Sequence, residues 1–393
     1  MKKLFPFILI CMLCWACEDL PTIDPSSYAC NLSFPDLSSS NDQKDDFQEA
    51  IDEYLQEEVA VQIAVKKGDQ NWTASAGWAD YPNEIPFEVC TPSMVGSISK
   101  VFTGVLLMQL HEEGILSVED SLAKWLDPEM VAEIPNADKV TLRQCLNHTT
   151  GIPDYLEVES YLDAVNTPFT KKTQREKLEY IFGDEPNSEP GLSFDYSNSN
   201  YVILGLVVEK ARNMSLWDAV KVYITDPMGL DQTFMGTEED PIPDGVARPY
   251  REIASGKYQE MMHLAVYDAA TGDGGIASNG QDLNEFITGI FDGRLMREES
   301  LQIMLGDSVS VSDQASFEQW SGEHYGLGIE IYQTPYGTAY GHTGSTSTYT
   351  AFLLYFPEED ISFATLYHME PKGDYYEHRK TLQDRLLAVL FTE

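Results

Sequence analysis

Basic side chains are scarce in this chain. Lys and Arg together number 25 against 64 Asp and Glu in 393 residues, which gives a formal net charge of −39. Proteins that bind nucleic acid neutralise its phosphates with Lys and Arg, so this composition excludes a role in binding DNA or RNA. The negative charge itself is typical of a soluble, self-repelling surface.

The N-terminal apolar run is short. Residues 4–14 are mostly apolar, follow Lys2-Lys3 and precede Ala16-Cys17. This order is typical of a secretory signal, and the run is too short for a membrane-spanning helix. We predict that residues 1–16 are a signal peptide. Residues 17–40 are polar and contain three prolines, and we predict that they form a tether.

The Ala16-Cys17 junction resembles the end of a bacterial lipoprotein signal. This resemblance implies cleavage before Cys17 and a lipid on that residue. The protein is then expected in the cell envelope, on the periplasmic side, with the lipid as its only attachment to the membrane. Cys14 and Trp15 differ from the Leu and small residue usual in such signals, so plain secretion remains an alternative.

Few cysteines remain once the signal and the lipid candidate are set aside. They are Cys30, Cys90 and Cys145; an odd number leaves at least one unpaired within the chain, and the pairing stays open. No Cys/His spacing is typical of a zinc site, and His111-Glu112-Glu113 lacks the second His of H-E-x-x-H. We therefore expect no metal and no cofactor.

No Pro/Gly/Ser-rich linker divides the middle of the chain. One catalytic unit over residues 41–393, with a helical subdomain inserted at roughly 110–290, fits this better than two domains. The hydrophobic pattern predicts strands near both ends and mostly helices between them, hence an antiparallel sheet built from both termini. The strands are expected over 59–67, 71–79, 338–345, 349–356 and 361–368.

Three helices outside the catalytic motifs have readable ends. One is expected over residues 45–58 and another, closing the chain, over 375–391. A third is expected over 282–290, with Ser278 and Gln281 as its capping box.

The segment Ser97-Ile98-Ser99-Lys100 places a hydroxyl and an amine on one face of a helical turn. Residues 101–108 are apolar nearly all round, which is typical of a buried helix. A serine hydroxyl is a poor nucleophile until a base takes its proton, and a buried, uncharged lysine can be that base. We predict Ser97 as nucleophile and Lys100 as base, with an N-cap and a surface-reaching lysine as the simpler alternatives.

Weaker copies of such motifs occur elsewhere. Ser121 and Lys124 repeat the spacing ahead of a short amphipathic stretch, and we interpret Ser121 as a surface residue. Tyr81-Pro82-Asn83 precedes Ser97 in the chain, and we set it aside. His148-Thr149-Thr150-Gly151 lies in a Gly/Pro turn, and we interpret it as a structural loop.

Two further motifs follow Ser97 and Lys100 along the chain, Tyr196-Ser197-Asn198 and His342-Thr343-Gly344. In this order the three resemble the motifs of the penicillin-recognising serine hydrolases. The nearest branch holds class C β-lactamases, serine D-Ala-D-Ala carboxypeptidases and related esterases and D-aminopeptidases. The resemblance covers roughly residues 41–393.

The resemblance implies an α+β fold. Five antiparallel strands would be flanked by the N- and C-terminal helices, with a mostly helical subdomain inserted, as in β-lactamases and DD-peptidases. The active site would lie in the groove between sheet and subdomain. It implies acyl transfer in which Ser97 attacks a carbonyl while Lys100 and Tyr196 move the proton.

The same resemblance implies how substrate is held. Asn198 would hold Lys100 and a substrate carbonyl, and the N–H groups of Ser97 and Ser345 would hold the oxyanion. Gly344 would let substrate approach the backbone. His342 and Thr343 would orient the proton network or bind a substrate carboxylate.

The expected substrate is a small peptide, ester or β-lactam, with D-Ala-D-Ala carboxypeptidase-like activity in cell-wall peptide metabolism favoured. A β-lactamase, an esterase and a catalytically silent muropeptide or penicillin sensor are the alternatives. A carboxypeptidase needs a cation opposite the substrate carboxylate. Between Ser321 and Gly341 there is no Lys or Arg, only His324; Arg248 is the other candidate.

Overall fold

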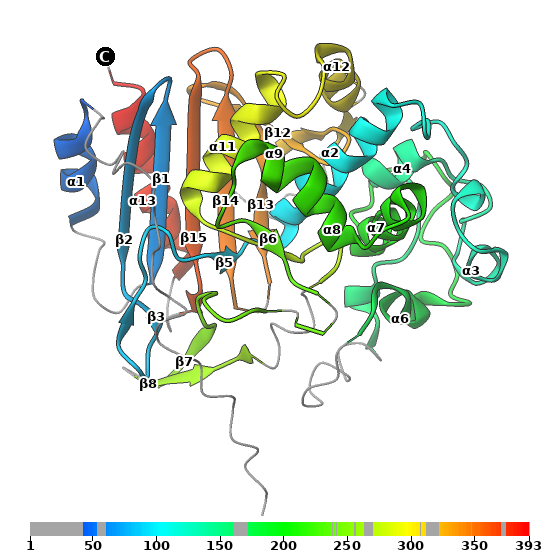
Figure 1. Ribbon diagram of the computed structural model, residues 1–393, viewed down its shortest axis with the longest axis horizontal. Helices are drawn as coiled ribbons and strands as arrows, with labels where there is room; N and C mark the ends of the chain where they lie inside the picture. Colours follow the sequence, from blue (N-terminus) through cyan, green and yellow to red (C-terminus); the bar gives the residue numbers. More distant parts are fainter. Residues whose placement is uncertain are drawn as a thin grey trace, which may run out of the picture.

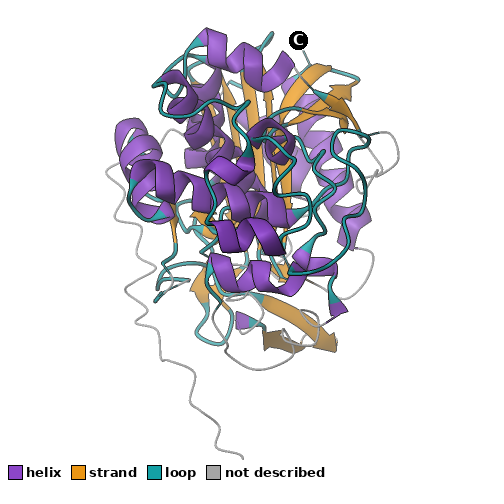
Figure 2. Cartoon of the chain, turned by 90° about the vertical axis from the view of Figure 1, so that its right-hand side faces the viewer, coloured by secondary structure: helices purple, strands orange, loops and turns teal. Residues whose placement is uncertain are grey.

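A computed structural model describes residues 42–52, 60–159, 172–237, 239–240, 242–254, 257–262, 270–306, 308–311, 322–346, 348–370 and 375–392. The predicted signal peptide, Cys17, the tether and Cys30 lie outside these residues. Figure 1 shows a central sheet with helices on both faces, and Figure 2 shows the helical layer in front of the strands. The fold is α+β, as the sequence predicts.

The central sheet is antiparallel throughout and, within the described residues, has eight strands in the order β10-β11-β12-β13-β14-β15-β1-β2. It joins the two ends of the chain because β1 pairs with β15, with Val61 opposite Tyr367. The five predicted strands are confirmed, and β10, β11 and β12 extend the sheet beyond the five expected. The strands are β1 (Val61–Lys67), β2 (Gln70–Ala76), β10 (Val309–Ser310), β11 (Gly322–Tyr325), β12 (Glu330–Thr334), β13 (Gly337–Ser345), β14 (Thr350–Phe356) and β15 (Ile361–Tyr367).

Each face of the sheet has its own hydrophobic core. In β14, Leu353 packs into the core shared with α2 and α11, while its neighbours Phe352 and Leu354 pack into the core shared with α1 and α13. This alternation follows from the two-residue period of a strand. Because both faces are covered, the strand is apolar at nearly every position. The longer helices are α1 (Lys44–Asp52), α2 (Ser99–Glu112), α7 (Asn198–Arg212), α11 (Gly280–Phe291), α12 (Glu298–Gly306) and α13 (Tyr375–Leu390).

The region between α2 and α11 is built of helices, turns and short strands (Figure 1). Here α7 and α8 (Leu216–Val220) pack against α2, of which eleven residues are buried, while α4 (Leu142–Leu146) and α6 (Gln174–Leu178) pack against α7. The region also contains α3 (Pro128–Glu133) and α9 (Asp226–Met228). The short strands are β6 (Phe234–Met235), β7 (Tyr250–Ala254), β8 (Lys257–Glu260) and β9 (Ile276–Ser278). Outside the region, β9 also pairs with β5 (Ser93–Met94) and β7 with β16 (Met369–Glu370).

The start of α11 differs from the prediction. Asn279, not Ser278, caps this helix: its side chain accepts the N–H of Asp282 at 2.8 Å. The Ser278 hydroxyl instead lies 2.7 Å from the Thr233 hydroxyl. The capping box expected at Ser278 is therefore wrong, because a tertiary hydrogen bond takes the side chain that the local pattern assigned to the helix.

Of the three remaining cysteines, Cys90 and Cys145 lie within the described residues. Cys90 is disulfide-bonded, and its partner lies outside the described residues. Cys145 is free and fully buried, and burial raises the pKa of its thiol to about 12. A thiol of this kind is inert.

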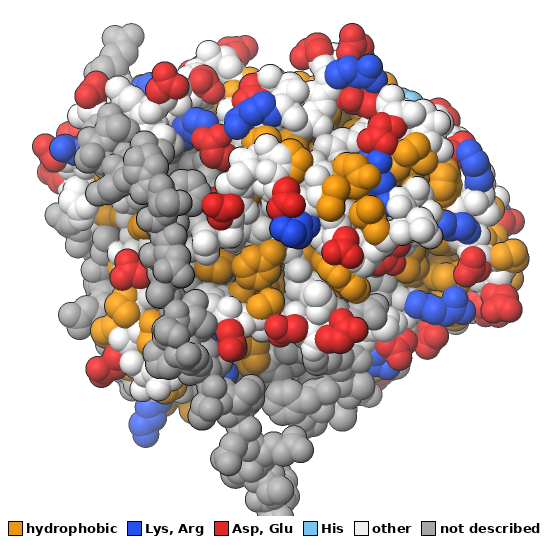
Figure 3. All heavy atoms as spheres, viewed as in Figure 1, with side chains coloured by type: hydrophobic (Ala, Val, Ile, Leu, Met, Phe, Trp, Pro, Cys, Tyr) orange, Lys and Arg blue, Asp and Glu red, His pale blue; other side chains and the backbone are white. Residues whose placement is uncertain are grey.

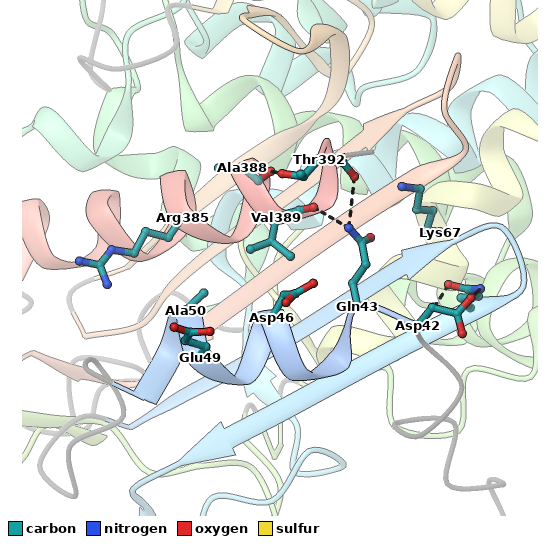
Figure 4. A pocket seen from close by; sticks show the side chains of 11 residues that line it. Asp42, Gln43, Asp46, Glu49, Ala50, Lys67, Arg385, Ala388, Val389 and Thr392 are labelled. Atoms are coloured by element: carbon teal, nitrogen blue, oxygen red, sulfur yellow. Dashed lines mark hydrogen bonds between the residues drawn. The ribbon is translucent and has the colours of Figure 1, made fainter.

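The charge of the surface agrees with the acidic composition of the chain. Acidic side chains are spread over the face seen in Figure 3 among fewer basic ones. Among the described residues, no helix is both long and apolar enough to span a bilayer. A pocket of about 810 Å³ lies between α1 and α13 (Figure 4), on the face of the sheet opposite α2, and is separate from the groove expected between sheet and helical subdomain.

Candidate active site

Ser97 lies in a tight turn pressed against β13. The turn is a 3₁₀ helix, Gly96–Ile98, that runs directly into α2. A Cβ on Gly344 would come within 1.9 Å of the Val95 carbonyl oxygen, and one on Gly96, whose φ is +52°, within 2.8 Å of the Ser345 nitrogen. Glycine at both positions therefore lets the turn and the strand approach closely enough to form one wall of a site.

Lys100 is fully buried beneath this turn. Its Nζ lies 2.9 Å from Ser97 Oγ, 2.7 Å from Asn198 Oδ1 and 3.0 Å from the Asp273 carbonyl oxygen. Three acceptors match the three N–H donors of an ammonium group. When the amine is neutral, the Ser97 contact can reverse, so that the hydroxyl donates to Nζ. Ser97 itself is half-buried and remains accessible.

Asn198 is held from behind by Asp154. Asn198 begins α7, and its Nδ2 donates to Asp154 Oδ2 at 2.6 Å. The other Asp154 oxygen accepts the N–H of Leu156 at 3.0 Å. Burial raises the pKa of Asp154 to about 6, although the hydrogen bonds and the Lys100 charge oppose this. Asp154 thus fixes which end of the Asn198 amide faces Lys100, a role that no sequence motif indicated.

Asp273 also contributes more than a turn. Besides its carbonyl contact with Lys100, its Oδ2 accepts the Tyr155 hydroxyl at 2.9 Å. Gly272, Gly274 and Gly275 surround it in the chain, and by itself this pattern predicts only a turn.

Tyr196 lies over Lys100, with Nζ 5.0 Å from the ring centroid. Burial raises its pKa well above the ordinary value, and a hydrogen bond with Ser97 opposes this. The resting side chain is therefore a phenol that can donate a proton. Its ring stacks on His148, with centroids 4.3 Å apart.

The loop that carries His148 holds Tyr196 in place. His148 has φ +57° and is fully buried. Burial, and next the Lys100 charge, lower its pKa well below the ordinary value, so its neutral Nδ1 accepts the Ser197 N–H at 3.1 Å. The loop predicted for this segment is confirmed. Its contacts with Tyr196 and Ser197 also orient the Tyr196-Ser197-Asn198 motif.

His342 is uncharged. Its Nδ1 lies 2.5 Å from the Thr343 carbonyl oxygen and its Nε2 lies 2.9 Å from the Tyr325 hydroxyl. This pattern fits a tautomer with the proton on Nδ1. Burial, and next the Lys100 charge, lower its pKa to about 3. A neutral imidazole gives no positive charge to hold a substrate carboxylate.

A carboxylate, Glu330, lies beside this motif. Its Oε2 accepts the Thr343 N–H at 3.0 Å and also the Tyr332 hydroxyl. Burial raises its pKa to about 7, against the opposing Thr343 hydrogen bond and Lys100 charge. No motif or spacing in the sequence singles out Glu330, because it is one acidic residue among 64.

The backbone geometry favours an oxyanion site. The Thr343 N–H points toward Glu330, and the two-residue period of a strand directs the Ser345 N–H the same way. Ser345 adjoins the Ser97 turn, since a Cβ on Gly344 would lie 3.3 Å from the Ser97 nitrogen. The backbones of Ser97 and Ser345, whose N–H groups are the two predicted oxyanion donors, are thus neighbours.

The other candidates lie elsewhere. Ser121 and Lys124 are exposed, and Lys124 pairs with Asp120 at 2.8 Å. Tyr81 packs on Tyr258, with ring centroids 4.7 Å apart. Arg248 forms an ion pair with Glu260, so the suggestion that it serves the groove gains no support.

The fold and the arrangement of Ser97, Lys100 and Tyr196 together define a penicillin-recognising serine hydrolase. The beta-lactamase family model matches residues 47–388, and the chain belongs to that family. Penicillin-binding protein 4* of Bacillus subtilis (strain 168) is 26% identical over 344 residues, covering 84% of this chain and 71% of that protein. Protein flp of Staphylococcus aureus (strain MW2) is 29% identical over 42% of this chain, which spans only 31% of that protein.

A solved structure supports the same fold. D-amino acid amidase from Ochrobactrum anthropi SV3, complexed with L-phenylalanine amide, superposes with a TM-score of 0.77 at 21% identity, over 89% of this chain and 99% of that one. At this identity the likeness establishes the fold alone.

Proposed function

We propose that the protein hydrolyses small amide and ester bonds through an acyl-enzyme on Ser97. The observation that carries this proposal is the 2.9 Å contact between Lys100 Nζ and Ser97 Oγ. A fully buried amine beside an accessible hydroxyl is the arrangement that nucleophilic catalysis requires, whereas a pure binding protein has no use for it.

Acylation follows from the positions of the side chains. With Lys100 in its uncharged form, Ser97 Oγ attacks the substrate carbonyl carbon and its proton passes to Lys100 Nζ. The oxyanion is held by the N–H groups of Ser97 and Ser345, each such donor contributing about 3 kcal/mol of transition-state stabilisation. Tyr196, a phenol at rest, gives its proton to the leaving amine or alkoxide and regains one from Lys100.

Deacylation reverses the proton path. Water attacks the acyl carbonyl from the side the leaving group has vacated. The bond between the acyl carbon and Ser97 Oγ breaks, and the proton lost by water passes through Tyr196 and Lys100 to Oγ. Asn198 keeps Lys100 aligned throughout, because Asp154 fixes the orientation of its amide.

A labelled penicillin and a chromogenic ester test the proposal. Wild type should form a covalent adduct that peptide mapping places on Ser97, and should turn over the ester. Ser97→Ala should abolish both, with loss of ester turnover of about 10⁴-fold or more. Ser121→Ala, in the exposed copy of the motif, is the matched control and should leave both intact. Ester turnover that survives Ser97→Ala contradicts the proposal.

The narrower candidate is a D-Ala-D-Ala carboxypeptidase-like activity on cell-wall peptides. The similarity to a penicillin-binding protein supports a peptide substrate. A terminal carboxylate needs a cation, however, and His342 is neutral while Glu330 is acidic. We therefore place general amide and ester hydrolysis first. Slow release of the penicillin adduct would favour the peptidase, and fast turnover a β-lactamase.

We propose in addition that the chain is exported and anchored by lipid on Cys17, with the polar residues 18–40 as tether. The N-terminal pattern of charge, apolar run and Ala16-Cys17 supports this. Metabolic labelling with a fatty acid should mark the wild type and not Cys17→Ser. An unlabelled wild type found in the medium would indicate plain secretion.

A further inference from the structure

The edge of β13 beside the reactive serine has an unusual neighbour. Pairing between β12 and β13 ends where Glu330 lies opposite Gly341. The next residues of β13, from His342 to Ser345, extend beyond β12. The Glu330 side chain fills the first position that a further strand residue would have occupied, and accepts the Thr343 N–H.

The donors that could receive a substrate carboxylate are already engaged. Thr343 directs its N–H to Glu330 Oε2 at 3.0 Å and its hydroxyl toward the same oxygen at 3.5 Å. His342 is turned to the Thr343 carbonyl and to Tyr325. A carboxylate arriving here would meet a like charge and no unengaged donor from these two residues.

The second oxygen of Glu330 is differently placed. Oε1 lies 3.7 Å from His342 Nδ1, beyond hydrogen-bonding distance, and the described residues supply no hydrogen bond to it. The side chain is 19% exposed. Glu330 therefore has an acceptor oxygen left for a substrate group that lies beside Thr343.

We propose that Glu330 determines the substrate class: the groove accepts amides whose group beyond the scissile bond is neutral or cationic, and rejects a terminal carboxylate. This rests on the proposed function, because it concerns the same groove. Glu330 acts by direct contact with that substrate group, through Oε1 and its negative charge.

The titratable groups around Glu330 determine how this discrimination depends on pH. The titratable groups facing Glu330 are Lys100 from α2, Tyr196 from the loop before α7, Tyr325 from β11, Tyr332 from β12 and His342 from β13. Burial raises the pKa of Glu330 to about 7, so its charge is lost progressively as the pH falls through that value. The discrimination against a carboxylate should therefore strengthen as the pH rises through about 7.

Three substrates that share one acyl group isolate the effect. They are N-acetyl-D-Ala-D-Ala, its C-terminal amide, and N-acetyl-D-Ala joined to ethylenediamine, which carry a negative, a neutral and a positive leaving group. At pH 8 wild type should favour the neutral and positive substrates in kcat/KM by about 10-fold or more over the carboxylate. Glu330→Gln should reduce this preference by about 10-fold, and Glu330→Asp should retain it. Glu358→Gln, in an exposed turn, should change nothing.

The outcomes separate the two proposals. Failure of wild type on a simple chromogenic ester overturns the proposed function and the role of Glu330 together. Ester turnover with a preference for the free carboxylate, with none of the three peptides cleaved, or with a preference unchanged in Glu330→Gln overturns only the role of Glu330. A KM difference between the substrates that disappears in Glu330→Gln supports direct contact.

Discussion

The candidate active site has a helical wall and a strand wall, which differ in the side chains they present. The helical wall, from α2, the start of α7 and the loop at Asp273, surrounds one buried lysine with three oxygen acceptors. The strand wall, from β12 and β13, presents a neutral His342 and an acidic Glu330. On the proposed mechanism, the helical wall carries out the proton transfer, and the strand wall supplies an oxyanion donor and selects the substrate.

This division predicts that damage to the helical wall lowers the rate for all substrates alike. Lys100→Ala removes the base and leaves its buried partners without a donor, so kcat/KM should fall by about 10⁴-fold on every substrate. Lys124→Ala, in the exposed copy of the motif, should leave kcat/KM unchanged, as steady-state assays can check. Equal loss in both variants would contradict the assignment of Lys100.

The contact between the walls is the next most sensitive point. In Gly344→Ala the new Cβ would lie 1.9 Å from the Val95 carbonyl oxygen, so β13 must move away from the Ser97 turn. Displacing the Ser345 N–H should cost about 10² to 10³ in kcat, with a lower melting temperature. Gly306→Ala, where a Cβ meets nothing within 4 Å, should leave kcat intact. An unchanged kcat in Gly344→Ala would show that the strand does not supply an oxyanion donor.

Asp154 tests the helical wall through a residue that does not touch substrate. Both of its oxygens accept N–H donors, from Asn198 and Leu156, and Asp154→Asn has only one oxygen to offer. The Asn198 amide should lose its fixed orientation, lowering kcat by about 10-fold with little change in KM. Asp127→Asn, at an exposed position, is the control. A changed KM with unchanged kcat would assign Asp154 to substrate binding instead.

A substitution in the strand wall should change how the free energy of unfolding depends on pH. Burial raises the pKa of Glu330 from its ordinary 4.5 to about 7, so the native state binds the proton more tightly than the unfolded state. Its favourable contribution is present below pH 4.5 and is lost as the pH rises through about 7. Glu330→Gln should therefore gain about 2 kcal/mol relative to wild type between pH 5 and pH 8, measured by urea unfolding. A relative stability that falls with rising pH would mean that Glu330 is ionised and paired in the native state.

A substitution outside both walls should lower stability without changing activity. Asn279→Ala removes the cap of α11 and should cost about 1 kcal/mol of unfolding free energy. Ester kcat should stay within twofold. Ser278→Ala separates the two capping assignments, because it should not shorten α11 in hydrogen exchange.

The fold was largely predictable because its strands carry local signals. The turn at Gly68-Asp69 joins β1 and β2, and β13 to β15 lie within a residue or so of their predicted bounds. The start of α11 was not predictable, since Ser278 and Asn279 are both good caps and the contact with Thr233 decides between them.

The site residues also divide into those that the sequence predicts and those that it does not. Ser97 and Lys100 were predictable because three residues of one turn fix their relation, and the motifs that contain Tyr196 and His342 have a recognisable order. Asp154 and Glu330 carry no such spacing: each is a single carboxylate among 64 acidic residues, and only its burial beside a distant segment distinguishes it.

The sequence by itself determined the reactive pair, the order of the three motifs and the strands that build the sheet, because each depends on residues near one another in the chain. Only the tertiary structure decided which carboxylates face the groove and that His342 is neutral. Those properties arise from burial and from charges brought together across the fold, and burial cannot be read from a single residue's neighbours in sequence.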